Sequence, residues 1–246
     1  MEMKDGLQKT EGEIRAFLMI GQSNMAGRGE FSDVEPISNK LCYMLRMGRW
    51  QKMSEPINPD RPIFEGKFHS GVSLGASFAD DLAKASGEQI GLIPCADGGT
   101  AISQWMPGQV LYDHAVMQCK LAQRSSKLCA ILWHQGETDC KDDGRVLAYK
   151  EKFITMMTAL RRDLGDESLP IIIGELPHHI APVWERGDRP AKLNAIFAEI
   201  VRELPHCTLV SAEGLEMKPD GIHFNASSYR EFGHRYAKAY LSIERK

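Results

Sequence analysis

Short apolar runs alternate along this chain with amphipathic segments of helical length, and this alternation constrains the fold more than any other feature. Five runs have the length and composition of buried strands: 14–20, 89–94, 128–133, 170–176 and 206–212. Segments with apolar residues at helical spacing lie at 72–85, after Leu111, at 146–164 with Gly165 as a C-terminal stop, from Pro190 and from Ala226. This order predicts parallel pairing through helical crossovers. We therefore expect an α/β protein, a three-layer α/β/α sandwich with a mainly parallel five-stranded sheet.

The alternation runs through the 246 residues, which predicts a single domain over 1–246. Residues 1–13 are polar and predict an N-terminal extension. Residues 31–70 break the alternation, because they are rich in Pro, Gly and Asn, with a strand-like piece at 41–46. We expect a long ornamented loop or a small hairpin region there, and long loops in compact domains are often functional.

Charge and hydropathy argue against several classes of partner. The net charge is −3 with a pI of about 6.3 and no basic stripe, so we expect no nucleic-acid partner. No stretch approaches the roughly 20 apolar residues of a membrane span, so no membrane partner is expected. The polar N-terminus has no apolar core like that of a signal peptide, and the six cysteines never form CxxC pairs. The expected location is cytoplasmic, and the oligomeric state is left open.

The most informative residues follow the predicted strands, at the carboxyl edge where open parallel sheets bind ligands. GQSNMAGRG follows the first strand, CADGGTAISQW the second, HQGETDC the third, and a loop with KPDGIHFN the fifth. A hydroxyl, backbone donors, an amide, carboxylates and an imidazole thus converge on one edge. This convergence predicts a catalytic or binding site.

Ser23 lies in a glycine-flanked turn, where its oxygen can be exposed and its own N–H can bind an anion. The alternative is a plain N-cap serine. The string is not the GxSxG elbow, because Met25 stands where that motif has its second glycine.

Asp220 and His223 form a D-x-x-H turn before the last helix. The carboxylate can accept from one ring nitrogen and leave the other for a serine, as the acid of a triad does. An isolated D-x-x-H is more often a turn and a cap, but Ser23 at the same edge favours the triad.

Gly98, Gly99 and Gln135 could supply the donors that stabilise a tetrahedral intermediate. The glycines permit close backbone approach, and the Gln135 amide can donate from a neighbouring strand end. The alternatives are an ordinary turn for the glycines and a loop amide for Gln135.

Other residues near these segments have competing interpretations. Glu137 could orient His223 or, as we favour, hold the turn that presents Gln135. Trp105 could stack on a sugar ring or fill the wall of the site. Residues in loops that could reach the site are Trp50, Trp184 and the pair His178-His179. No zinc-ligand spacing occurs, so no metal is expected, and Cys95 and Cys140 are interpreted as packing residues.

Together these segments resemble the SGNH (GDSL-like) hydrolases, and most the branch with sialate O-acetylesterases and the acetylxylan esterases of carbohydrate esterase family 6. The matching blocks are GQSNMAGRG, GLIPCADGGTAISQW, ILWHQGETD and DGIHFNASSYREFG, in the family's order from Gly21 to about Gly233. The resemblance implies a flavodoxin-like SGNH hydrolase fold over the whole chain.

By the same resemblance Ser23 is the nucleophile, His223 the base and Asp220 the acid. The oxyanion donors would be the Ser23 N–H, a backbone N–H at Gly98 or Gly99, and the side chain of Gln135, which replaces the Asn of the SGNH label. No cofactor is implied.

The expected function is therefore hydrolysis of small acyl esters, acetyl above all, on a small molecule or oligosaccharide. Two alternatives remain open: a non-catalytic carbohydrate-binding protein on the same scaffold, since function belongs to sites and not to folds, and a lipase or thioesterase. The sequence does not name the sugar.

Overall fold

The computed structural model describes residues 3–4, 7–8, 13–59, 69–178 and 180–244. Within these ranges seven strands form one sheet in the order β5-β4-β6-β3-β7-β8-β9. The five expected strands are all present and mutually parallel: β3 (Ile14–Gly21), β6 (Ile90–Pro94), β7 (Ser126–His134), β8 (Ile171–Gly174) and β9 (Cys207–Val210).

The expected number of five strands is wrong, because β4 (Cys42–Arg46) and β5 (Arg49–Lys52) extend the sheet at one edge. Both come from the 31–70 region, where a small hairpin was one of the two expectations. The turn between them places Met47 and Gly48 at φ 52° and 73°, the left-handed pair that suits a two-residue hairpin. Strand β4 then pairs in parallel with β6, with Cys42 opposite Ile90. That pairing joins segments far apart in sequence, so local pattern could not reveal it.

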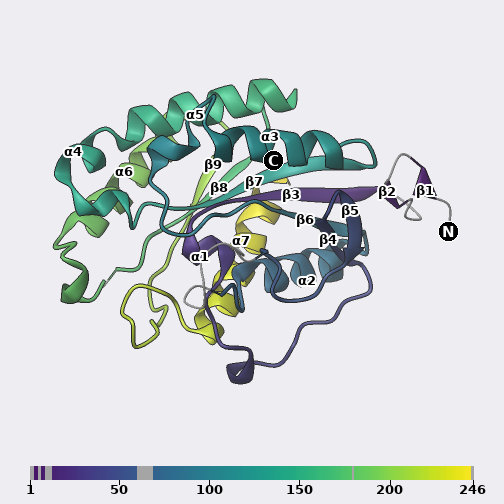
Figure 1. Ribbon diagram of the computed structural model, residues 1–246, viewed down its shortest axis with the longest axis horizontal. Coiled ribbons are helices and arrows are strands. Elements are labelled where there is room, and N and C mark those ends of the chain that lie inside the picture. Colours follow the sequence, from purple (N-terminus) through teal and green to yellow (C-terminus); the bar gives the residue numbers. More distant parts are fainter. Residues whose placement is uncertain (1–2, 5–6, 9–12, 60–68, 179, 245–246) are drawn as a thin grey trace.

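Helices cover both faces of the sheet, as expected for a three-layer sandwich (Figure 1). On one face lie α2 (Leu74–Ser86) and α7 (Ala226–Glu244), which pack on each other. On the other lie α3 (Val110–Ala122), α5 (Tyr149–Leu164) and α6 (Arg189–Glu203). Phe17 of β3 contacts Phe78 and Tyr240 edge-on in the first layer, and Trp133 of β7 contacts Phe153 in the second. Both faces of the central strands are therefore buried, which explains their unbroken apolar runs.

The helix ends follow local sequence. The Ser73 hydroxyl accepts a hydrogen bond from the Gly75 N–H at the start of α2, and Gly165 ends α5 at φ 83°. One expected helix differs, since the 146–164 segment begins earlier as α4 (Asp143–Leu147) and restarts at Tyr149 as α5. Asp142 caps α4 by accepting from the Arg145 N–H, which sets this earlier start.

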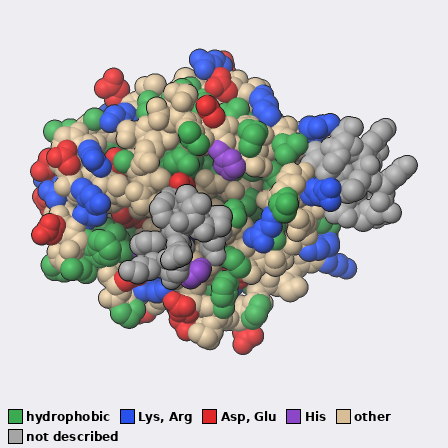
Figure 2. All heavy atoms as spheres, viewed as in Figure 1, with side chains coloured by type: hydrophobic (Ala, Val, Ile, Leu, Met, Phe, Trp, Pro, Cys, Tyr) green, Lys and Arg blue, Asp and Glu red, His purple; other side chains and the backbone are tan. Residues whose placement is uncertain are grey.

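The periphery adds little to the site. Two short strands, β1 (Met3–Lys4) and β2 (Leu7–Gln8), pair within the 1–13 extension, most of which lies outside the described residues. Basic and acidic side chains are interspersed over the face shown in Figure 2. Over the described ranges, the helices are too short or too polar to cross a bilayer.

Candidate active site

Ser23 stands where the central strand β3 runs into the short helix α1 (Ser23–Ala26). Gly21 permits this junction, because a Cβ at its φ of 136° would lie 2.0 Å from the His134 carbonyl oxygen on β7. The Ser23 side chain is nearly buried but lines a cleft. Its backbone N–H donates to no described acceptor. A hydroxyl and an unused backbone donor thus face the same space.

The imidazole of His223 lies directly against this serine. The His223 Nε2 atom is 2.9 Å from the Ser23 Oγ atom, and Nδ1 is 2.8 Å from the Asp220 Oδ2 atom. His223 belongs to the loop between β9 and α7, so the fold brings together residues 200 positions apart. The three side chains form a continuous hydroxyl, imidazole, carboxylate series, as the sequence predicted.

Asp220 is held in place by its second oxygen. The Asp220 Oδ1 atom accepts from the backbone N–H groups of Ile222 and His223, each at 3.0 Å. Partial burial opposes the charge, but these two donors and the His223 ring outweigh it and lower the pKa of Asp220. The carboxylate therefore stays ionised beside the imidazole.

Glu137 makes no contact with His223 and instead lies fully buried against Asn24, the residue after Ser23. Its Oε1 atom accepts from Asn24 Nδ2 at 2.5 Å and lies 3.4 Å from His134 Nε2. Asn24 also donates to the Ile222 carbonyl at 3.0 Å and accepts from the Tyr229 hydroxyl at 2.6 Å. Burial by itself would raise the pKa of Glu137. The interactions with His134 and Asn24 lower this pKa by more than burial raises it, so the pKa of Glu137 is lowered overall. Asn24 thus ties helix α1 to the loop that carries His223, and Glu137 holds Asn24 in place.

Gln135 is placed differently from expectation, since it lies behind the cleft wall with no exposed surface. Its amide nitrogen donates to the Thr100 carbonyl at 2.8 Å and to Asp139 Oδ2 at 2.6 Å. Its oxygen accepts from the Tyr149 hydroxyl at 2.6 Å. Because the Gln135 amide forms all these hydrogen bonds within the protein and has no exposed surface, it cannot donate to a substrate in this geometry.

Gln22 lines the cleft instead, next to Ser23. Its side-chain oxygen accepts from the Thr138 N–H and from Gln135 Nε2, each at 3.3 Å. Its amide nitrogen has no described acceptor and is not sealed from solvent. Gln135 therefore orients Gln22, and the donor that reaches the cleft is the residue just before the serine. GQSN in the sequence was the available signal.

Gly98 and Gly99, in the loop after β6, are glycines for different physical reasons. A Cβ on Gly98 would lie 2.7 Å from Arg28 Nη2 and 3.6 Å from the Ser23 Cβ atom, so the backbone of Gly98 adjoins Ser23. Gly99 has φ 75° and open space where a Cβ would stand. Close approach explains Gly98, and backbone conformation explains Gly99.

The cleft holds about 320 Å³, a size suited to a small ligand. Ser23 and His223 line it, and the rest of its lining comes from the loops after β3, β5, β6, β7 and β8 and before α7. The polar and aromatic wall residues are Gln22, Arg28, Asn58, Ser70, Asp97, Thr138, Lys141, Trp184 and Arg186. The four charged residues in this set, Arg28, Asp97, Lys141 and Arg186, were not singled out from the sequence. The loop after the fourth strand was expected to reach the site through Trp184 and the His178-His179 pair, and Arg186 is the residue of that loop that the sequence analysis missed.

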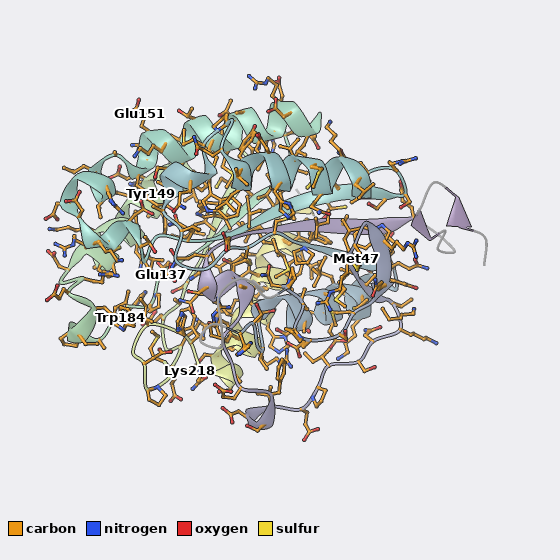
Figure 3. All side chains as sticks on the ribbon, in the orientation of Figure 1. Met47, Glu137, Tyr149, Glu151, Trp184 and Lys218 are labelled. Atoms are coloured by element: carbon orange, nitrogen blue, oxygen red, sulfur yellow. The ribbon has the colours of Figure 1, made fainter. Side chains whose placement is uncertain are left out.

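Only the tertiary structure shows which tryptophans line the cleft and which belong to the hydrophobic core. Trp105 is fully buried, donates to the Thr100 hydroxyl and packs edge-on against Trp133, so it belongs to the core and fits neither of its two alternatives, stacking on a sugar or filling the wall of the site. Trp50 is buried in β5. Trp184 lines the cleft, and its Nε1 donates to the Asp220 carbonyl at 2.8 Å. Figure 3 shows Trp184 and Lys218 at one end of the sheet, far from Met47 at the other.

The remaining candidates stay outside the site. His178 pairs with Glu175 at 3.0 Å and does not line the cleft, and His179 lies outside the described residues. Cys95 and Cys140 are buried, which raises the pKa of both thiols and leaves them protonated. Across the described ranges, no three His, Cys, Asp or Glu side chains gather as metal ligands.

A larger cavity of about 770 Å³ lies at the opposite end of the sheet, around Arg15, Lys127 and Tyr240. Arg15 is already bound there to Glu88 at 2.7 Å and to the Tyr240 hydroxyl at 2.6 Å. The lining has no hydroxyl paired with an imidazole, so size alone does not make it the reactive site.

Comparison with known proteins identifies the family of this chain. Residues 13–242 match the model of a family described as carbohydrate esterase, sialic acid-specific acetylesterase. A probable carbohydrate esterase of Arabidopsis thaliana is 32% identical over 98% of this chain and 95% of its own length. The solved Arabidopsis structure superposes with a TM-score of 0.83 at 30% identity, covering 94% of this chain and 99% of that one.

Two further structures are similar in fold at lower identity. NanS has a TM-score of 0.73 at 17% identity, covering 95% of this chain and 98% of its own. A carbohydrate acetylesterase from Xanthomonas citri has a TM-score of 0.67 at 20% identity, covering 93% of this chain and 56% of its own. At these identities the likeness concerns the fold alone.

Proposed function

Because the chain belongs to the family of carbohydrate esterases described as sialic acid-specific acetylesterases, we propose that it removes O-acetyl groups from a carbohydrate through Ser23, His223 and Asp220. The chain is a carboxylic ester hydrolase by its family. What is proposed is the triad, the oxyanion donors and the class of substrate.

The observation that carries the proposal is the unbroken contact from Ser23 Oγ to His223 Nε2 at 2.9 Å and from Nδ1 to Asp220 Oδ2 at 2.8 Å. In the first step His223 takes the serine proton while Oγ attacks the acetyl carbonyl. Asp220 keeps Nδ1 protonated and stabilises the imidazolium. The imidazolium then gives its proton to the sugar oxygen as the bond between that oxygen and the acetyl carbon breaks, which leaves the acetyl-enzyme and a free sugar hydroxyl. A water molecule that gives its proton to His223 then attacks the acetyl-enzyme, and acetate leaves as the proton returns to Ser23.

The negative charge on the tetrahedral intermediate needs donors that point at it beforehand. We assign the Ser23 N–H, the backbone of Gly98 and the side-chain amide of Gln22 to this role. Gln22 replaces Gln135 in the assignment because its oxygen is held by Thr138 and Gln135 while its nitrogen opens to the cleft.

A short acyl group on a polar carrier fits the cleft. The cleft of about 320 Å³ carries polar groups from several loops beside its apolar surface, and Trp184 offers a partly exposed ring at the rim. Aromatic rings of this kind pack against sugar faces, whereas a fatty chain needs a long apolar channel.

The direct test is Ser23→Ala, assayed by acetate release from p-nitrophenyl acetate and from an acetylated sugar. We expect kcat to fall by about 10³-fold or more with little change in Tm, because one hydroxyl is removed. Ser32→Ala is the matched control, since Ser32 is exposed and outside the cleft. Wild-type kcat in a folded Ser23→Ala protein would refute the assignment.

The oxyanion assignment has its own test in Gln22→Ala. Loss of one donor to the intermediate should lower kcat by roughly 10²-fold while KM changes little. Gln51→Ala on the distant β5 strand serves as the control. An unchanged kcat would show that another donor stabilises the oxyanion and would not bear on the proposed triad.

A further inference from the structure

The acid of the proposed triad, Asp220, lies at an exposed corner of its loop. Its carboxylate accepts from the N–H groups of Ile222 and His223 and contacts the His223 ring, all within that loop. On the inner side of the loop, Asn24 donates to the Ile222 carbonyl at 3.0 Å. These bonds hold the side chain of Asp220 and the residues after the corner. The backbone carbonyls of Asp220 and Gly221, which form the corner itself, are bound from a different segment of the chain.

This segment is the short helix η4 (Pro182–Trp184) together with Ala181, the residue before it. The Trp184 Nε1 atom donates to the Asp220 carbonyl at 2.8 Å, and the Ala181 N–H donates to the Gly221 carbonyl at 2.8 Å. A Cβ on Gly221 would lie 2.2 Å from the Ala181 Cβ atom, so the two segments pack in direct contact. Because two neighbouring carbonyls are each held by a donor, the corner has little freedom to rotate.

The segment that holds the corner is itself anchored to the end of the sheet. Arg186 is buried, and its Nε atom donates to the Glu137 carbonyl at 2.9 Å while Nη1 donates to the Trp184 carbonyl. The Nε atom of Arg189 donates to the Cys140 carbonyl at 2.6 Å. Both of these acceptors outside the segment lie in the loop after β7. Hydrogen bonds from charged donors are stronger than neutral ones, so η4 is a firmly held support.

The geometry points to Trp184 as a positioning residue for the acid of the triad: its indole N–H holds the corner at which the Asp220 carboxylate meets His223 Nδ1. This inference rests on the proposed triad and adds a residue to it. The acid works only while it keeps the imidazole in one tautomer and orientation, and small displacements of reacting groups are costly in rate. The ring of Trp184 lines the cleft, whereas its N–H is committed to Asp220.

Loss of this N–H should affect catalysis more than stability. Trp184 and the Asp220 side chain are both partly exposed, so water can satisfy the Asp220 carbonyl once the indole donor is gone. Water does not tie the corner to η4, and the carboxylate then spends less time in line with the imidazole. The loss therefore falls on kcat, and it falls on every ester because every ester uses the same acid.

The test is Trp184→Phe, which keeps an aromatic ring and removes only the N–H donor. Acetate release is measured from an acetylated sugar and from ethyl acetate, whose alcohol is too small to cover an aromatic ring. We expect kcat to fall by about 3- to 10-fold on both esters, with KM and Tm little changed. Val183→Ala is the matched control, since Val183 lies in the same helix η4, is exposed and is not part of the cleft lining. A wild-type kcat, or a change confined to KM of the sugar ester, would overturn the positioning role.

A double-mutant cycle with Asp220→Asn tests whether Trp184 acts through the carboxylate. In the Asp220→Asn protein no carboxylate remains to be positioned, so Trp184→Phe should lower the residual kcat by less than about 2-fold. If the two losses multiply, Trp184 acts independently of Asp220 and the inference is wrong. Absence of hydrolysis of both esters by the wild-type protein would instead overturn the proposed function.

Discussion

Two carboxylates, those of Asp220 and Glu137, lie near the proposed nucleophile Ser23, and we expect Asp220→Asn and Glu137→Gln to damage different properties. Asp220 contacts His223 Nδ1 at 2.8 Å, whereas Glu137 contacts Asn24 and His134 and never the catalytic imidazole. Asp220→Asn should therefore lower kcat, and Glu137→Gln should lower stability.

The magnitudes follow from the contacts. In Asp220→Asn the new amide turns a donor toward Nδ1 or forces the wrong tautomer, so kcat should fall by about 10²- to 10⁴-fold. The Asp220 Oδ1 atom still accepts two backbone N–H groups, and the side chain is partly exposed, so Tm should change little. In Glu137→Gln a buried charge disappears beside His134, and mismatched buried donors cost about 1–3 kcal/mol.

The assay is kcat on an acetyl ester together with Tm for both variants. For a domain of this length each kcal/mol lowers Tm by about 2–4 °C, so the loss in Glu137→Gln is measurable. A Glu137→Gln protein with wild-type Tm and the larger loss of kcat would refute the reasoning and make Glu137 the acid of the triad.

Three further predictions concern the thiols, the acyl group and pH. Burial raises the pKa of the Cys95 and Cys140 thiols, so iodoacetamide under native conditions should leave esterase activity unchanged while a serine-directed fluorophosphonate abolishes it; the reverse pattern would implicate a cysteine. The cleft of about 320 Å³ should give acetyl esters a higher kcat/KM than butyryl or octanoyl esters, and a preference rising with chain length would support a lipase or thioesterase. The pKa of Glu137 is lowered in the fold, so its carboxylate stabilises the protein above its ordinary value of about 4.3, and this contribution is lost as pH falls below that value. Urea unfolding at a series of pH values should show the advantage of wild type over Glu137→Gln shrinking in acid, and a constant difference would contradict it.

The sequence alone determined the parts that depend on short-range pattern. Unbroken apolar runs reflect strands buried on both faces, so β3, β6, β7, β8 and β9 and their parallel order could be predicted. The ends of those strands share an edge, which placed Ser23 near His223. Asp220 could be assigned because three residues of turn bring it to the imidazole.

Only the tertiary structure decided features that depend on where a side chain points. Sequence placed both Gln22 and Gln135 at the edge, but the contacts with Thr100, Asp139 and Tyr149 turn Gln135 inward and leave Gln22 at the cleft. Trp105 and Trp184 were equally eligible until packing buried the first.

The same dependence on tertiary contacts explains why the sequence analysis missed two strands of the sheet and the arginine Arg186 in the cleft lining. Strand β4 joins the sheet through pairing with β6, a contact that no local pattern encodes. Arg186 looks like an ordinary loop arginine in PVWERGD, and only the fold shows that it is buried and lines the cleft. Periodicity reports which face of an element is buried, whereas orientation within a loop is set by partners that fold in from distant parts of the chain.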